Sequence, residues 1–359
     1  MPTHHQHFVP RTYLREWETT VETSANPAQK FNGVYSFVGE SKTGEGKNIK
    51  SILWQQSLYT INFGQLFISQ YCPLVYKDFV EQVFDLMTNR SPQAIYGKLG
   101  YSIIKTKNSV RKHLNEIDNW DFYYFDGNLA RKKGIISDIH ALNSYILEDG
   151  LDSEFERSWK NVLNDFISAM KNPLYGVEGD SVRIIPEGIA KNILSFFFMM
   201  LCRNPQFDGM GIYSWVRDDL LYPVFGEQSE PFIKGLWYTE LYRMLFKSKG
   251  GHYHTFLDTA MAQCQMILFE AYNNAGAFIT SDNPAYQNRS TAVERDNRNG
   301  FVFPLSPKYL IMICKGSDGY NKVDYRMATA DVVRYYNRAT FSNKTDTVIA
   351  NQKDLSLLM

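Results

Sequence analysis

The sequence predicts an α+β fold, mainly helical with short strands, in a single domain that spans residues 1–359. Apolar residues recur at helical spacing in several long segments, whereas segments of strand-like composition are short and lie mostly late in the chain. A chain of 359 residues can also bury a substantial core without disulfides or metals. A split near residues 176–181 is conceivable, but two polar motifs lie on either side of it, so we expect one cooperative unit.

The first half of the chain should begin with a half-buried strand over residues 33–40, where β-branched, aromatic and small polar residues mix. Apolar residues at helical spacing predict a helix over 73–87, which has a proline in its first turn. Residues 94–117 are helical in composition but contain two glycines, so this helix could be two pieces. The aromatic run 120–125, closed by an Asp-Gly turn signal, predicts a strand.

The second half should hold the main helices. Apolar periodicity and proline or glycine stop signals predict helices over residues 146–169, 186–202, 255–272 and 330–341. The helix over 186–202 is apolar on all faces near its end, so we expect it to be buried at the centre of the fold.

Short strands are expected between and after these helices, over residues 277–280, 301–303 and 309–314. The first of them would deliver a Ser-Asp-Asn-Pro turn within a late pair of strands. The charged segment 288–299 should be a loop, because its hydrophobicity is low.

Composition argues against several classes of protein. Lys plus Arg and Asp plus Glu both number 38, so there is no global cationic field, and a nucleic-acid partner would have to meet a local basic patch. The densest basic cluster, within residues 130–133, is most simply a solvated loop. The cysteines lack the CxxC spacing of zinc ribbons. The longest apolar run, 196–202, is far shorter than the ~20 residues of a membrane span, and the start has no secretory pattern, so we expect a cytoplasmic protein with no membrane partner.

A polar segment at the N-terminus, His5-Gln-His-Phe-Val-Pro-Arg-Thr-Tyr-Leu-Arg15, is the first candidate site. Its proline fixes the local backbone, and an imidazole held in that way can act as general acid, general base or metal ligand. His7 is therefore a catalytic candidate, with Tyr13 and Arg15 as substrate-binding candidates. The alternative is that His7 and Arg15 anchor a terminus that would otherwise fray.

A second polar motif, Thr280-Ser-Asp-Asn-Pro284, follows a predicted strand. Asp282 could bind Mg²⁺ or Mn²⁺ through hard oxygen or orient an imidazole, and Asn283 could hydrogen-bond a phosphate or a base edge. The alternative is a structural turn, because Asp and Asn before Pro often bond to nearby backbone. We expect His7 and Asp282 to share one polar site.

Together these motifs resemble the bacterial family catalogued as domain of unknown function 4238. The resemblance rests on the N-terminal segment, on the Thr-Ser-Asp-Asn-Pro motif and on Pro304-Leu-Ser-Pro307 after it; Arg11 and Trp17 stand where the family has Gln and Phe. By this resemblance Arg203, at the end of the buried helix, could clamp a phosphate or carboxylate, and Glu156 matches an acidic position. A simpler role for Arg203 is to satisfy the last carbonyls of its helix.

Some members of that family occur in anti-phage defence loci, and this implies an effector that cleaves nucleic acid, most simply RNA. His7 would then be the acid or base, and Asp282 the metal ligand. The alternative is a non-enzymatic sensor or scaffold that recognises a phage component or a nucleotide, in which both motifs hold the fold together. The GxGxxG, P-loop, HExxH and GxSxG motifs are absent. Their absence disfavours a dinucleotide oxidoreductase, a P-loop NTPase, a zincin and an α/β-hydrolase.

Overall fold

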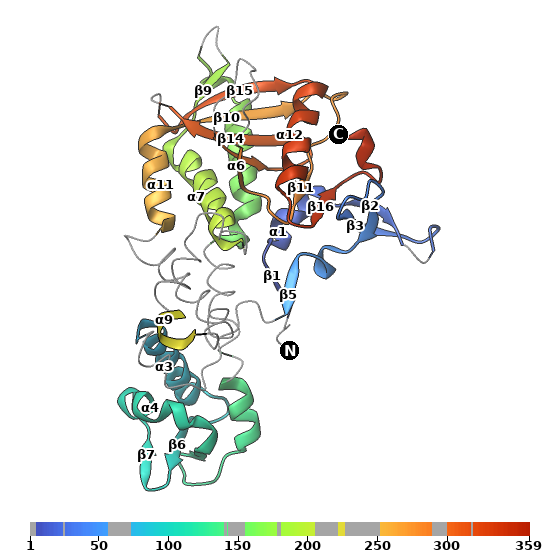
Figure 1. The fold of residues 1–359 in the computed structure, drawn as a ribbon. Coiled ribbons are helices and arrows are strands. Elements are labelled where there is room, and N and C mark those ends of the chain that lie inside the picture. Colours follow the sequence, from blue (N-terminus) through green and yellow to red (C-terminus); the bar gives the residue numbers. More distant parts are fainter. Residues whose placement is uncertain are drawn as a thin grey trace. The chain divides into compact units, whose positions relative to one another are not determined.

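The computed structural model describes residues 5–23, 26–56, 73–139, 142, 155–177, 181–204, 222–226, 252–288, 300–316 and 319–359. By its contacts the chain divides into two compact units. The larger unit comprises His7–Gln55, Asp152–Ile212 and Ser248–Met359, and the smaller unit comprises Met1–Gln6, Gln56–Leu151 and Tyr213–Lys247. Figure 1 colours the chain along its sequence and labels many of the elements of both units.

A mixed sheet forms the centre of the larger unit. Within the described ranges it has six strands in the order β12-β13-β14-β10-β15-β9. These strands are β9 (Val182–Ile184), β10 (Cys264–Ala271), β12 (Tyr286–Asn288), β13 (Gly300–Pro304), β14 (Tyr309–Lys315) and β15 (Lys322–Ala328). The central strand β10 runs antiparallel to β14 and parallel to β15, so it is hydrogen-bonded along both edges.

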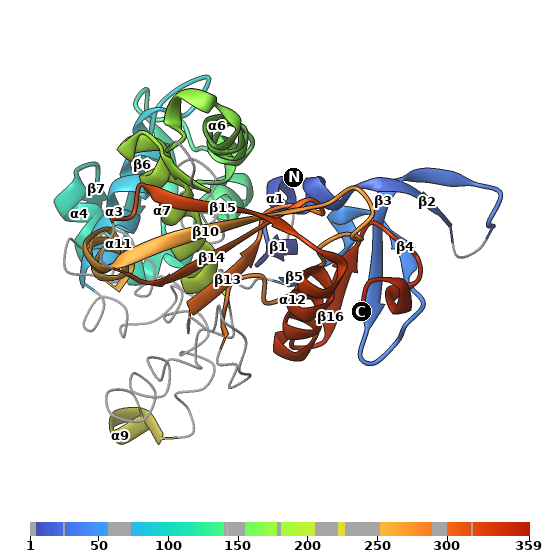
Figure 2. The ribbon, with the colours of Figure 1, turned by 90° about the horizontal axis from the view of Figure 1, so that it is seen from above.

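Helices cover both faces of this sheet, as Figure 2 shows. On one face lie α6 (Trp159–Lys171), α7 (Glu187–Arg203) and α11 (His252–Gln263), and on the other lies α12 (Ala330–Asn343). Trp159 of α6 and Phe196 of α7 stack with 4.0 Å between ring centroids, and Phe303 of β13 packs beside them. Tyr336 of α12 packs on the opposite face. The sheet is therefore buried on both sides, which explains the apolar composition of its central strands.

A second sheet in the larger unit carries the Ser-Asp-Asn-Pro turn. Its strand order is β11-β16-β3-β2, and β4 pairs with β3. The strands are β2 (Thr19–Glu22), β3 (Lys30–Val38), β4 (Glu45–Lys47), β11 (Thr280–Ser281) and β16 (Thr347–Ala350). Near the N-terminus, β1 (His5–His7) is followed by the short helix α1 (Arg11–Leu14), and β5 (Trp54–Gln56) follows β4. The sheet joins segments from both ends of the chain.

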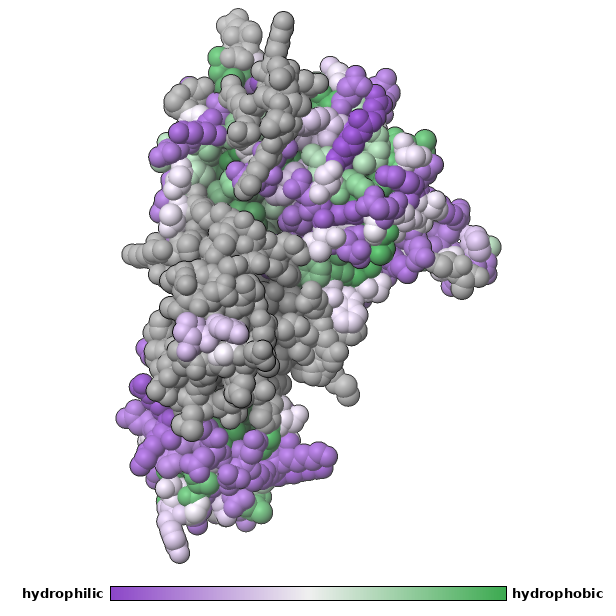
Figure 3. Space-filling model, viewed as in Figure 1, coloured by the Kyte–Doolittle hydropathy of each residue, from purple (hydrophilic) through white to green (hydrophobic). Residues whose placement is uncertain are grey.

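The smaller unit is built on an antiparallel sheet with the order β7-β6-β8. Its strands are β6 (Ile95–Leu99), β7 (Ser102–Ile104) and β8 (Asp121–Tyr124), and its helices include α3 (Pro73–Thr88), α4 (Lys107–His113) and α9 (Tyr222–Phe225). Val83 of α3, Val110 of α4 and Phe122 of β8 are fully buried in one apolar cluster. The described surface of this unit is largely hydrophilic on the face seen in Figure 3.

The expectation of a mainly helical α+β fold is wrong, because the structure is a mixed α/β fold with extensive sheets. Residues 264–271, predicted as the end of a helix, form the central strand β10. Residues 95–104 form a hairpin instead of a helix, and Gly100 at its turn has a φ of +56° that favours glycine. The Ser-Asp-Asn-Pro turn follows β11. This strand pairs with β16, near the end of the chain, and not with a strand close to it in the sequence.

Several predicted elements are confirmed. The helices over 73–87, 186–202 and 330–341 correspond to α3, α7 and α12, and the strands over 33–40, 120–125, 301–303 and 309–314 correspond to β3, β8, β13 and β14. The first part of the helix expected over 146–169, and most of the loop 288–299, lie outside the described residues. No described helix has the length and apolar character that would let it cross a bilayer. A single cooperative domain stays a prediction.

Replacing Phe197 by Ala should lower the free energy of unfolding by about 3–5 kcal/mol, because a fully buried ring leaves a cavity among packed neighbours. Phe197 lies edge-on to Phe301 with 5.6 Å between ring centroids. Chemical denaturation of purified protein measures the change. The exposed Lys191→Ala on the same helix is the control and should change stability by less than about 0.5 kcal/mol. A loss below about 1 kcal/mol for Phe197→Ala would place this helix outside the core.

Candidate functional site

Tyr13 anchors the N-terminal motif inside the larger unit. Pro10 precedes α1 with φ −58° and ψ 135°, and this turns the chain into the helix that carries Tyr13. The Tyr13 hydroxyl lies 2.7 Å from Thr280 Oγ1 and donates to the Pro304 carbonyl at 2.7 Å. Burial raises the pKa of Tyr13 well above its usual value, so the phenol is neutral. Tyr13 is fully buried and joins the N-terminal segment to the two downstream motifs, which leaves it no surface for substrate.

Arg203 binds two of the other candidate site residues, Glu156 through its side chain and His7 through its backbone. Its Nη1 donates to Glu156 Oε1 at 2.5 Å, and its Nη2 donates to the backbone carbonyl of His7 at 2.6 Å. The arginine side chain is 2% exposed and that of Glu156 is 15% exposed. The guanidinium therefore neutralises one carboxylate and fixes the end of β1 against the end of α7, as a planar fork with several donors can do.

Asp282 accepts hydrogen bonds from three backbone amides. Oδ1 accepts from Thr345 N at 2.9 Å, and Oδ2 accepts from Asp346 N at 2.8 Å and from Thr347 N at 2.9 Å. The residue is 5% exposed. A carboxylate has about four lone-pair positions, so three are used here. Asp282 thus fixes the connection between α12 and β16, and its partners lie more than 60 residues downstream.

Two asparagines complete this arrangement. Asn204 Nδ2 donates to the carbonyl of Asp282 and to Asn283 Oδ1, each at 3.0 Å. Asn283 Nδ2 donates to the carbonyl of Asn343, at the end of α12, at 2.9 Å. Because Arg203 and Asn204 are adjacent, this dipeptide ties the N-terminal motif to the Ser-Asp-Asn-Pro motif.

We call the residues joined in this way the motif cluster: His7, Glu156, Arg203, Asn204, Asp282 and Asn283. Sequence reasoning did not single out Asn204. The sequence did contain a signal for Asn204: the pair Asn204-Pro205 follows the buried helix, just as the pair Asn283-Pro284 follows β11. Arg15 is exposed at the end of α1, and among the described residues no hydrogen bond of the cluster involves it. The structure thus brings five of the seven sequence candidates into the cluster, with Tyr13 beside it.

The chemistry available to the cluster follows from these partners. Within the described ranges, no group of three or more His, Cys, Asp or Glu side chains is placed to hold a metal ion. Asp282 keeps one lone-pair position, on Oδ1, and would need other ligands to bind Mg²⁺ or Mn²⁺. Glu156 keeps some contact with solvent and is the more accessible carboxylate for proton transfer.

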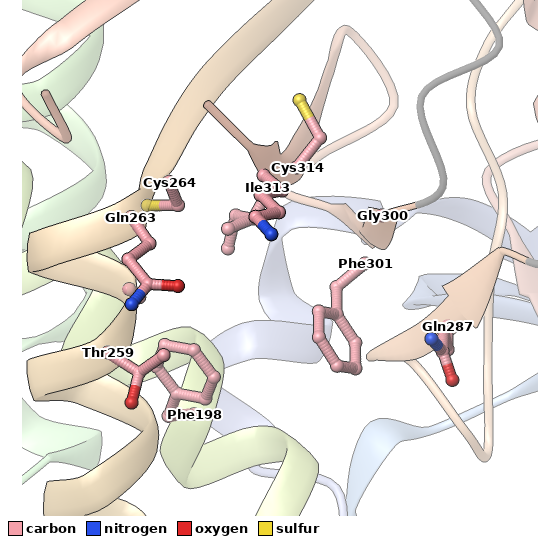
Figure 4. Close-up of a pocket in the computed structure, with 11 residues that line it drawn as sticks. Phe198, Thr259, Gln263, Cys264, Gln287, Gly300, Phe301, Ile313 and Cys314 are labelled. Carbon is pink, nitrogen blue, oxygen red and sulfur yellow. The ribbon is translucent and has the colours of Figure 1, made fainter. Parts of the chain in front are cut away.

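A pocket of about 280 Å³ lies elsewhere in the larger unit, on the α7 and α11 side of the sheet. Figure 4 shows the ring of Phe198 beside Thr259 and Gln263 of α11, with Phe301 of β13 across from them. Burial raises the pKa of the Cys264 thiol, which also lines the pocket, to about 12. The thiol is therefore protonated and unreactive near neutral pH. No member of the motif cluster lines this pocket, so the two features are separate.

Comparison with known proteins identifies a family. The family model described as "Protein of unknown function (DUF4238)" matches residues 5–230 and 239–354. This confirms the resemblance seen in the sequence motifs. No curated protein and no solved structure matches the chain.

Replacing Asp282 by Asn should destabilise the larger unit by about 3 kcal/mol, because the amide cannot accept all three bonds and turns a donor toward backbone donors. Thermal and chemical denaturation measure the loss. Asp331→Asn is the matched control, since that side chain is 89% exposed and pairs with Arg334 on the surface. If both variants were equally stable, the three bonds would contribute little to the fold.

Proposed function

The chain belongs to the DUF4238 family, and on that premise we propose that it is a cytoplasmic anti-phage defence protein that works by binding. It recognises a phage component or a nucleotide, and the motif cluster serves to hold its fold together. The defence role comes from the family resemblance. The choice of binding over catalysis comes from the geometry of the cluster.

The observation that carries this proposal is the set of three backbone bonds to Asp282. A carboxylate that binds a metal or moves a proton must offer lone pairs to its substrate or ion. Asp282 is nearly buried and gives most of its lone pairs to the loop before β16. Its role in this arrangement is to position backbone.

Arg203 supports the same conclusion. One of its two partners is the carbonyl of His7, which is a backbone atom. Any residue at position 7 supplies that carbonyl, so the clamp needs the chain at this position and not the imidazole. The other partner, Glu156, neutralises the guanidinium and weakens its attraction for a phosphate.

A nuclease acting on RNA or DNA is the second candidate, and the position of Glu156 favours it. Its partly exposed carboxylate shares a guanidinium with the backbone of His7, so an acid and base pair could form there. In this case His7 would be the acid or base and Glu156 its partner, with Arg203 steadying both. Mg²⁺ or Mn²⁺ could use only the remaining lone-pair position of Asp282 Oδ1 and would need further ligands from elsewhere.

The variants His7→Gln and Arg203→Lys separate the two candidates in a phage plating assay. The binding proposal expects His7→Gln to retain protection, because the clamped carbonyl remains. Arg203→Lys should lose protection together with about 2 kcal/mol or more of stability, because one ammonium nitrogen would replace the two guanidinium nitrogens that reach Glu156 and His7 separately. Loss of protection in a His7→Gln protein that melts like the unaltered protein would contradict the proposal and favour the nuclease.

Purified protein should leave total RNA, tRNA and DNA intact, with or without Mg²⁺ or Mn²⁺ and with or without chelator. Gel electrophoresis over a time course provides the measurement, and Glu156→Gln protein prepared in the same way is the control for contaminating nucleases. Cleavage by the unaltered protein that is absent from Glu156→Gln would establish the nuclease instead.

A further inference from the structure

The sheet of the smaller unit has one covered face and one open face. Backbone register assigns the side chains: Ile95 lies opposite Tyr124 and Gly97 opposite Phe122, on the face that packs against α3 and α4. Because side chains alternate along a strand, Tyr96 and Tyr123, which lie opposite each other in the register, project from the other face.

Aromatic rings gather on this open face. The rings of Tyr96 and Tyr123 stack with 5.8 Å between centroids and 24° between planes, and Phe125 tilts against Tyr96 at 5.5 Å. We call Tyr96, Tyr123 and Phe125 the aromatic platform. Tyr96 and Tyr123 are only partly buried, and Phe125 is 63% exposed.

Large apolar side chains surround the platform and are also exposed. Ile103 of β7 lies opposite Lys98 in the register and is 54% exposed, and Leu129, whose backbone bridges to Tyr123, is 67% exposed. Single exposed apolar residues need no explanation, but a contiguous group of them marks an interaction surface.

The charge around the platform is mainly positive. Lys98 projects from the same face as Tyr96, two residues further along β6. Arg131, Lys132 and Lys133 begin two residues after Leu129, at the start of a helix over 132–139. Two acids lie nearby: Asp121 stands opposite Lys98, and Asp126 accepts hydrogen bonds from Asn128. Four cations thus accompany two carboxylates in these segments, and Asp126 already accepts two hydrogen bonds from Asn128. The basic segment 131–133 thus follows closely on Leu129, whose backbone bridges to Tyr123 of the platform.

We infer that the aromatic platform binds single-stranded nucleic acid, with bases stacked on its rings and phosphates held by the bordering cations. Stacking on exposed rings of a sheet suits unpaired bases, because bases within a duplex are already stacked on one another. The cations supply contacts to the backbone that do not depend on sequence. The inference rests on the proposed function, since it names the component that such a binding protein would recognise.

Fluorescence anisotropy with the full-length protein tests the inference. The probes are labelled oligouridylate and oligothymidylate of about ten nucleotides, a size within the range of single-strand binding folds, and a duplex of the same length. Both single strands should bind, and the duplex should bind at least about 10-fold more weakly. Raising the salt concentration should weaken binding, because binding releases counterions from the nucleic acid and this release is less favourable at high salt.

Phe125→Ala should weaken single-strand binding about 5-fold or more, which is the effect of removing one stacking ring. Tyr272→Ala is the matched control, since Tyr272 is a 47% exposed aromatic residue of the larger unit, and it should bind as the unaltered protein does. Replacing Lys132 and Lys133 by Gln should reduce the dependence of binding on salt. Circular dichroism checks that each variant is folded.

Three results would overturn the inference: no binding of either single strand at low salt, tighter binding of the duplex, or equal affinities for Phe125→Ala and Tyr272→Ala. The first of these, found together with capture of a phage protein by the same face, would assign the platform to a protein partner instead. The measurement uses purified protein without phage. Failure of the nucleic-acid inference can therefore be distinguished from failure of the proposed function, because the proposed function is tested by phage protection and by cleavage assays.

Discussion

The larger unit depends on one buried carboxylate that must be satisfied. Asp282 has almost no access to water, and an unpaired charge in that position would be very costly. Three consecutive backbone amides, from Thr345 to Thr347, meet this need. The same bonds fix the chain where α12 ends and β16 begins, so that β16 pairs with β11 on one side and with β3 on the other. A single side chain thereby sets the register in which the last strand joins the N-terminal half of the chain.

The Arg203 clamp extends this constraint to the N-terminus. Asn204 holds the Ser-Asp-Asn-Pro turn, and its neighbour Arg203 holds the end of β1, so the C-terminal end of α7 joins both motifs. Tyr13 adds a third link through its bonds to Thr280 and Pro304. The motifs that identify the family are therefore the residues that join the distant segments of the fold. Nucleic-acid recognition, as proposed, falls instead to the smaller unit, where the aromatic platform is.

Local pattern was enough to predict some elements and misleading for others. The helix α7 was predictable because a proline precedes it and apolar residues cover all its faces near its end. The strand β10 was not, because a strand buried on both faces carries a continuous apolar run, such as Met266–Phe269, that also suits a buried helix. At the site, the sequence pointed to Asp282, Asn283 and Arg203 as candidates, but it predicted a shared site only for His7 and Asp282. It could not assign their partners, because the amides that meet Asp282 belong to a loop more than 60 residues away.

Hydrogen exchange of the amides of Thr345, Asp346 and Thr347 tests the structural role of the motif cluster most directly. The amides of Thr345 and Asp346 belong to no helix or strand, and that of Thr347 lies at the start of the short strand β16. Without Asp282, all three would therefore exchange nearly as fast as in an unstructured chain. Bonded to a buried carboxylate, they should be protected to nearly the level of core strands such as β10, and should lose that protection in Asp282→Asn. Rapid exchange in the unaltered protein would show that the Asp282 carboxylate is free for other chemistry, and would contradict a structural role for Asp282.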